Sequence, residues 1–237
     1  MVLFSMLAVL WPSLLFALFG LDEKQDTSAF AWLGLSFSLN AYLSFLTSCS
    51  LVLVLYCGPL FQLVFLEDVM TDCDLKTLKD FIVLPICQEI VMRGALVAAL
   101  LGSGFNPNAA IAISACASAL LALDELTDMK LVKKEKTGEL LRGLLVNCAF
   151  QGLVGAFAAR LLVATGSLCG PITAQCFLSF MGPPDLGFLM NPAHYAFKAR
   201  SFVSAVYLVG LVGFYFLFPL MIDPTLFEPF HYSLSAN

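Results

Sequence analysis

The sequence contains little charge and very few groups that titrate near neutral pH. Of its 237 residues, 12% are Asp, Glu, Lys or Arg, and only two are histidines. A soluble domain typically carries about 25% charged residues. A chain with so few charges does not have the composition of a charged disordered protein, and the lack of a basic face or tail excludes nucleic acid as a partner.

The eight cysteines form no recognisable metal or disulfide motif. No two of them are spaced as Cys-x-x-Cys, and most lie inside apolar runs. Zinc sites and disulfide frameworks need clustered cysteines. We therefore expect these side chains to act as small apolar fillers, and we predict neither a metal site nor a cofactor.

Apolar residues make up 60% of the chain, against about 45–50% in a typical soluble protein. Long uncharged runs separate short polar stretches, and several are long enough to cross a bilayer core of about 30 Å. The pattern predicts an all-α, polytopic transmembrane bundle of about seven spans. They cover approximately residues 2–20, 41–65, 81–101, 108–123, 143–164, 168–181 and 202–222.

The first run lacks a basic leader and a small-residue cleavage site, so we expect a span or anchor rather than a signal peptide. We divide the chain into an N-terminal span with an interfacial segment, residues 1–40, and a transmembrane domain, residues 41–237. The loops after the second, fourth and sixth spans contain nine of the 12 Lys and Arg residues. The positive-inside rule places these loops on the cytosolic side, or in the matrix of a mitochondrion.

The third span contains polar side chains at membrane depth, namely Gln88, Glu89 and Arg93. Charges in a bilayer are costly and usually face a partner or a cavity. Glu89 and Arg93 are four residues apart, so they share a helix face and can pair. Two interpretations are open: an internal salt bridge, or the polar floor of a hydrolytic cavity.

Other polar positions interrupt the apolar helices. Asp124 follows the fourth apolar run and either marks the membrane interface or contributes to a site. Gln175 and Ser179 share one face of the sixth predicted span, where small polar side chains often hydrogen-bond neighbouring helices.

Together these segments resemble the CAAX prenyl endopeptidase 2 family of Ras-converting intramembrane proteases. Gln88-Glu89-Ile-Val-Met-Arg93 resembles the family's Glu-Glu-x-x-x-Arg motif. Leu120-Leu-Ala-Leu-Asp124 stands in place of Phe-x-x-x-His, and Gln175-Cys-Phe-Leu-Ser179 in place of His-x-x-x-Asn. Further similar segments follow in the family's order at residues 55–62, 149–151, 165–166, 170–171, 180–182 and 220–224, so the resemblance covers approximately residues 50–228.

The departures from these motifs affect the chemistry that the resemblance implies. In the family, glutamate and histidine activate a water, while a second histidine and an asparagine bind the oxyanion. Glu89 and Arg93 are retained here, and Gln88, Asp124, Gln175 and Ser179 occupy the remaining positions. The two histidines, His194 and His231, lie outside all three motifs.

We therefore expect a catalytically impaired, CAAX prenyl protease-like membrane protein, a pseudoprotease that acts as a structural subunit of a larger membrane complex. One alternative is a divergent active endopeptidase that cleaves prenylated protein C-termini, with Glu89 as base and Asp124 as helper. Another is a lipid- or prenyl-binding protein.

The expected partners are membrane lipids and other membrane subunits. Gly152-Leu-Val-Gly155 and Gly210-Leu-Val-Gly213 permit close helix contacts, either with such subunits or within the chain. The resemblance implies the endoplasmic reticulum, with the mitochondrial inner membrane as the alternative.

Overall fold

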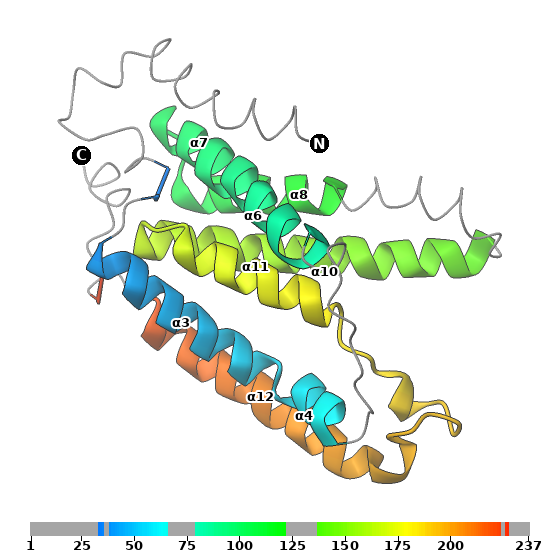
Figure 1. Ribbon diagram of the computed structural model, residues 1–237. Coiled ribbons are helices and arrows are strands. Elements are labelled where there is room, and N and C mark those ends of the chain that lie inside the picture. The colour runs from blue at the N-terminus through cyan, green and yellow to red at the C-terminus, as the bar shows by residue number, and fades with distance from the viewer. Residues whose placement is uncertain (1–32, 36–37, 66–78, 122–136, 224–225, 228–237) are drawn as a thin grey trace.

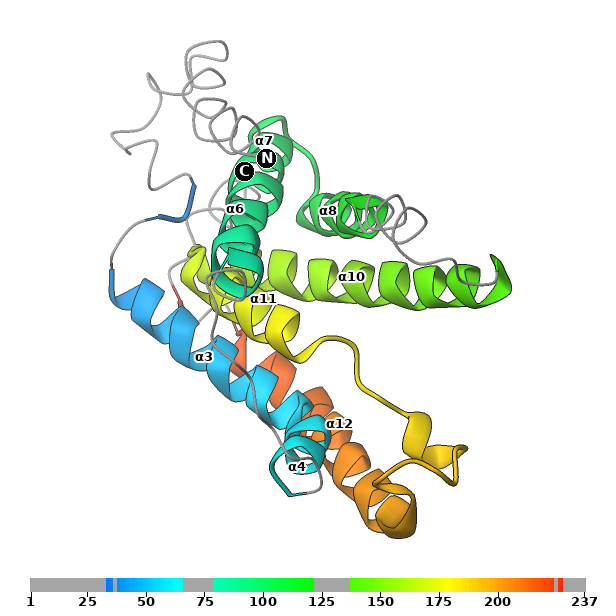
Figure 2. The same cartoon turned by 45° about the vertical axis from the view of Figure 1, so that its right-hand side comes forward.

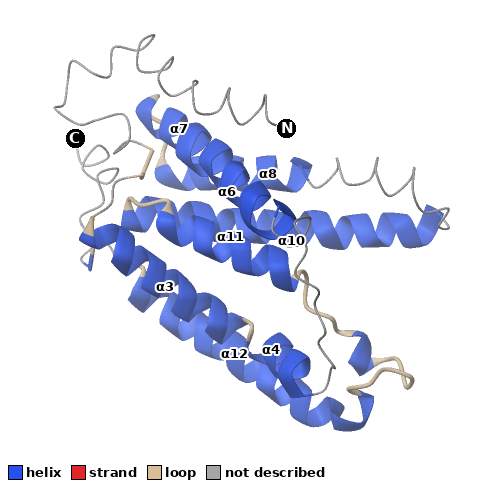
Figure 3. Cartoon of the chain, in the orientation of Figure 1, coloured by secondary structure: helices blue, strands red, loops and turns tan. Residues whose placement is uncertain are grey.

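The computed structural model describes residues 33–35, 38–65, 79–121, 137–223 and 226–227. Within them every regular element is a helix, which confirms the predicted all-α class (Figure 3). The elements are α3 (Leu39–Leu55), α4 (Cys57–Phe65), η2 (Lys79–Val83), α6 (Leu84–Glu89), η3 (Ile90–Val97), α7 (Ala98–Gly102), α8 (Pro107–Leu121), α10 (Thr137–Thr165), α11 (Cys169–Met181), η4 (Gly187–Leu189), η5 (Phe197–Ala199) and α12 (Arg200–Met221).

Several of these helices are candidate membrane spans. Lys79–Gly102, Arg142–Thr165 and Phe197–Met221 are long and apolar enough to cross a bilayer, and α3 with α4 forms a fourth candidate if the bent pair is one span. The helices α8 and α11 are apolar but shorter. The predicted first span and most of the N-terminal segment lie outside the described residues, so the count of seven and the division at residue 40 stay predictions.

The second predicted span is not a single straight helix. It bends by 68° between α3 and α4. Pro59 lies in the first turn of α4 and has no backbone N–H to donate to the preceding turn, which favours a break at this point. Tyr56 occupies the bend, and its hydroxyl donates to the carbonyl oxygen of Gly182, 2.9 Å away at the end of α11. The bend is therefore tied to the neighbouring helix.

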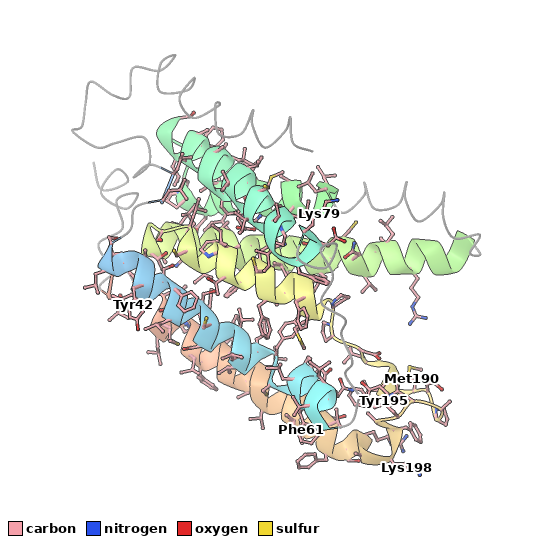
Figure 4. All side chains as sticks on the ribbon, in the orientation of Figure 1. Tyr42, Phe61, Lys79, Met190, Tyr195 and Lys198 are labelled. Carbon is pink, nitrogen blue, oxygen red and sulfur yellow. The ribbon has the colours of Figure 1, made fainter. Side chains whose placement is uncertain are left out.

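The helix ends alternate between two sides of the bundle (Figure 1). The ends of α4 and α11 and the beginnings of η2, α10 and α12 lie on one side, while the α10–α11 turn and the end of α12 lie on the other. Lys79 and Lys198 both lie on the first side (Figure 4). This arrangement agrees with the basic side inferred from the sequence.

The helix α10 lies at the centre of the packing. Figure 2 shows it with α8 on one side and α11 on the other, and both neighbours contact it. One core cluster joins α3, α10 and α11 through Leu51, Leu161 and Leu178. A second joins η3 and α10 through Val97 and Leu162. The site described below belongs to the helices that pack around α10 and α11.

A buried seam of small polar groups holds α3 against the start of α11. The Ser44 and Thr165 hydroxyls lie 3.0 Å apart, and the Gly170 N–H donates to Ser44 Oγ over 3.1 Å. Ser48 Oγ donates to the Gly170 carbonyl oxygen over 2.8 Å. Inside a bilayer such bonds keep polar groups satisfied without water. They also explain why a glycine is needed at 170, since a Cβ there would lie 3.0 Å from the Ser44 carbonyl oxygen.

Both glycine pairs singled out in the sequence pack within the chain. A Cβ on Gly155 would lie 2.8 Å from Ser118 Cβ in α8, and one on Gly210 would lie 2.7 Å from the Val54 carbonyl oxygen in α3. Gly152 and Gly213 face the same two helices. Of the two interpretations, internal packing is therefore the one that the structure supports.

This packing predicts a selective effect of added methyl groups on α10. Gly155→Ala places a methyl group against Ser118 and should lower the free energy of unfolding by about 1–3 kcal/mol, the usual cost of overpacking. The control is Gly143→Ala on the same helix, where a Cβ meets nothing within 4 Å. Thermal unfolding in detergent measures both, and an equal loss of stability in the two variants would contradict the packing.

Candidate polar site inside the bundle

Glu89 and Arg93 form a buried ion pair. Glu89 ends α6 and Arg93 lies in the π-helical η3, with Arg93 Nη1 2.9 Å from Glu89 Oε1. Both side chains are fully buried. The pairing predicted from the four-residue spacing is confirmed, and it neutralises two charges that the bilayer would otherwise make costly. The π-helical backbone is notable because such turns often occur at functional sites.

The pair leaves hydrogen-bonding capacity unused. Among the described residues, Glu89 Oε2 and Arg93 Nε have no hydrogen-bond partner, and the Nη1–Oε1 contact is close without the alignment of a hydrogen bond. The helix α11 packs on α6 and carries Gln175, which is 2% exposed and whose Oε1 also has no partner. Buried polar atoms are usually satisfied, so these side chains mark a candidate polar site between α6, η3 and α11.

The other positions of the three motifs differ in their surroundings. Gln88 and Ser179 are half-buried, on α6 and α11, the two helices that pack together. Asp124 lies outside the described residues, so its part in the site stays a prediction. The structure therefore brings together the helices that carry the first and third motifs.

The described histidine lies in a different part of the fold. His194 belongs to the loop between α11 and α12, where its ring lies near Phe188 and Tyr195. Phe188 packs in a small core cluster with Phe61 of α4 and Tyr207 of α12. His231 lies outside the described residues. Within the described part of the chain, no imidazole stands beside Glu89.

Both ring nitrogens of His194 are already used. The Ala196 N–H donates to Nδ1 over 3.1 Å, so Nε2 carries the proton and donates to Asp185 Oδ2 over 2.9 Å. The Gly187 N–H donates to the other oxygen of the same carboxylate. The bond from His194, followed by that from Gly187, holds the pKa of Asp185 below its ordinary value. This arrangement is a loop clamp rather than an acid–base dyad.

Sequence reasoning did not find this cluster. The Tyr207 hydroxyl donates to Gln62 Oε1 and joins α12 to α4 beneath the loop. Eight residues, among them η4 and Pro192, lie between Asp185 and His194, so no single helical or strand period links the two. The available signal was the presence of an acid and a histidine in the same short loop.

Comparison with known proteins identifies the family. A model of the type II CAAX prenyl endopeptidase Rce1-like family matches residues 75–181. The CAAX prenyl protease 2 of Arabidopsis thaliana is 30% identical over 185 residues, which are 77% of this chain and 54% of that protein. The chain thus spans about half the length of this curated relative. No solved structure matches the chain significantly.

The helices and their buried polar pair define an α-helical integral membrane protein with a polar site inside the bundle. The chain belongs to the CAAX prenyl endopeptidase family, as its motifs suggested. The segment matched by the family model contains Glu89 and Arg93 and extends through Gln175 and Ser179.

A double-mutant cycle tests the energetic importance of the buried pair. Glu89→Gln or Arg93→Met alone leaves one charge buried without its partner and should destabilise the protein by about 3–5 kcal/mol. The double variant removes both charges and should be more stable than the sum of the single losses implies. Thermal unfolding in detergent provides the measurement, and simple additivity would show that the two charges do not stabilise each other.

Removal of the loop clamp should loosen the loop without unfolding the bundle. Asp185→Ala should accelerate amide hydrogen exchange at Gly187 and Ala196, whereas Asp185→Asn keeps an acceptor oxygen and should have a smaller effect. Because the folded pKa of Asp185 is lowered, the contribution of the carboxylate is complete above its ordinary value of about 3.9 and is lost as the pH falls through the folded pKa. Unchanged exchange in Asp185→Ala at neutral pH would refute the clamp.

Proposed function

We propose that this chain is a catalytically impaired member of its family, a CAAX prenyl protease-like pseudoprotease. The observation that carries the proposal is the surroundings of Glu89. Its carboxylate is fully buried against Arg93, the packed helix α11 offers Gln175, and His194 is bound in a loop cluster with α4 and α12. The site retains charge, but among the described residues no imidazole stands beside it.

The side chains present cannot replace the groups that the family motifs imply. An amide such as Gln88 or Gln175 has no basic site near neutral pH and cannot take a proton from water. General acid–base catalysis typically contributes about 10²–10⁴-fold in rate. Loss of an oxyanion donor costs about a further 10²–10³-fold. With Gln175 and Ser179 in place of histidine and asparagine, we expect both contributions to be reduced.

The competing function is an active endopeptidase acting on prenylated protein C-termini. The name of the Arabidopsis relative, CAAX prenyl protease 2, supports it. In that case Glu89 would act as the base with Asp124 as its helper. Gln88 argues against this role, because it stands in place of the first glutamate of the family motif and an amide cannot accept the proton.

A structural role in a larger membrane complex and a location in the endoplasmic reticulum remain our expectations from the sequence. The two glycine pairs no longer support the first, because they pack against α8 and α3 of the same chain. Co-purification under mild detergent would support a complex role, and a retained isoprenoid found by native mass spectrometry would favour the prenyl-binding alternative.

A cleavage assay separates the pseudoprotease from the active enzyme. The purified chain should release no tripeptide from a farnesylated CAAX peptide above background, while the Arabidopsis relative serves as the positive control. The Glu89→Ala variant is the matched control for contaminating proteases, and it should give the same background. Cleavage by the wild type that Glu89→Ala abolishes would refute the proposal.

A further inference from the structure

The loop of residues 182–199 presents apolar side chains outside the membrane-spanning helices. It joins α11 to α12, and Met190 and Tyr195 lie with Lys198 at the same end of the bundle (Figure 4). Leu186, Leu189 and Met190 are 51%, 44% and 87% exposed. Exposed apolar groups in a loop are not explained by the lipid that surrounds the spans, so they need a partner of their own.

The exposure follows from a fixed loop conformation. Phe188, between the exposed leucines, is buried at 1% exposure in the cluster with Phe61 and Tyr207. The Asp185–His194 clamp closes the loop behind it. The short helix η4 therefore directs one side chain inward and its apolar neighbours outward.

The charges beside these side chains favour one kind of partner. Lys198 near the end of the loop and Arg200 at the start of α12 are exposed, and the Arg200 guanidinium lies 4.6 Å from the Phe197 ring centroid. The one acid of the loop, Asp185, faces His194. Lys79 begins η2 on the same side of the bundle (Figure 4). Basic residues beside exposed apolar and aromatic groups are typical of segments that bind the anionic surface of a bilayer.

We propose that this loop inserts Leu186, Leu189 and Met190 into the headgroup region of the leaflet on the basic side, where Lys198 and Arg200 bind anionic lipids. The partner is the surface of the bilayer in which the chain is embedded. The loop thereby anchors the beginning of α12 and the bent helix α4 at the interface. This anchoring does not depend on whether the Glu89 site is active.

Tryptophan fluorescence tests the insertion. In the full chain, the two native tryptophans are replaced by phenylalanine (Trp11→Phe, Trp32→Phe), and Met190→Trp introduces a single reporter. The protein is reconstituted into vesicles of equal parts phosphatidylcholine and phosphatidylserine. We expect blue-shifted emission that lipids brominated near the headgroup quench more strongly than lipids brominated near the chain ends. Leu189→Trp is the second reporter if the first variant does not fold.

A charge variant tests the anionic preference. Lys198→Gln should weaken the inserted state by roughly fivefold, since a base near an anionic surface contributes about 1 kcal/mol. Insertion of the unchanged loop should also be weaker in vesicles of phosphatidylcholine alone than in those that contain phosphatidylserine. The matched control is Arg142→Gln, which removes an exposed base on α10 and should leave the quenching unchanged.

Three results would overturn the proposal. The first is emission quenched by aqueous iodide but by neither brominated lipid, which would show a loop in water. The second is protection from iodide and from both lipids, which would show a protein partner on the loop. The third is stronger quenching from the chain ends, which would place the loop in the bilayer interior.

Discussion

The ion pair between Glu89 and Arg93 is the interaction on which the interior of this bundle depends. Each charge alone would be too costly at membrane depth, and the spacing of four residues lets one side chain neutralise the other. The pair occupies the junction of α6 and η3, where α11 packs against α6. The charges are thus compatible with a membrane interior whether or not they perform chemistry.

Around this pair, small residues bring the helices into close contact. Gly155 lets α10 approach α8, Gly210 lets α12 approach α3, and Gly170 lets the start of α11 approach Ser44. Lipid offers little hydrophobic driving force between helices, so close backbone contacts and buried hydrogen bonds take its place. A scaffold held together in this way does not depend on catalytic side chains, which is compatible with the proposed loss of activity at Gln175 and Ser179.

The helices could be predicted because an uncharged run long enough to cross a bilayer indicates that the segment lies in lipid. The same argument could not predict the 68° bend at Tyr56, which depends on Pro59 together with a tertiary bond to Gly182. The Glu89–Arg93 pair followed from spacing alone. The Asp185–His194 clamp could not be predicted from spacing, because the loop has no regular period. Whether the glycines pack within the chain or against another subunit could be decided only from the positions of α8 and α3.

The most direct test of the account compares the wild type with a variant in which the family side chains are restored, Gln88→Glu, Asp124→His, Gln175→His and Ser179→Asn together. Single-turnover release of the tripeptide from a farnesylated CAAX peptide is the measurement. The account predicts that the restored variant cleaves and that the wild type does not. Equal cleavage by the two proteins would contradict it, because these four positions would then not be where the chemistry was lost.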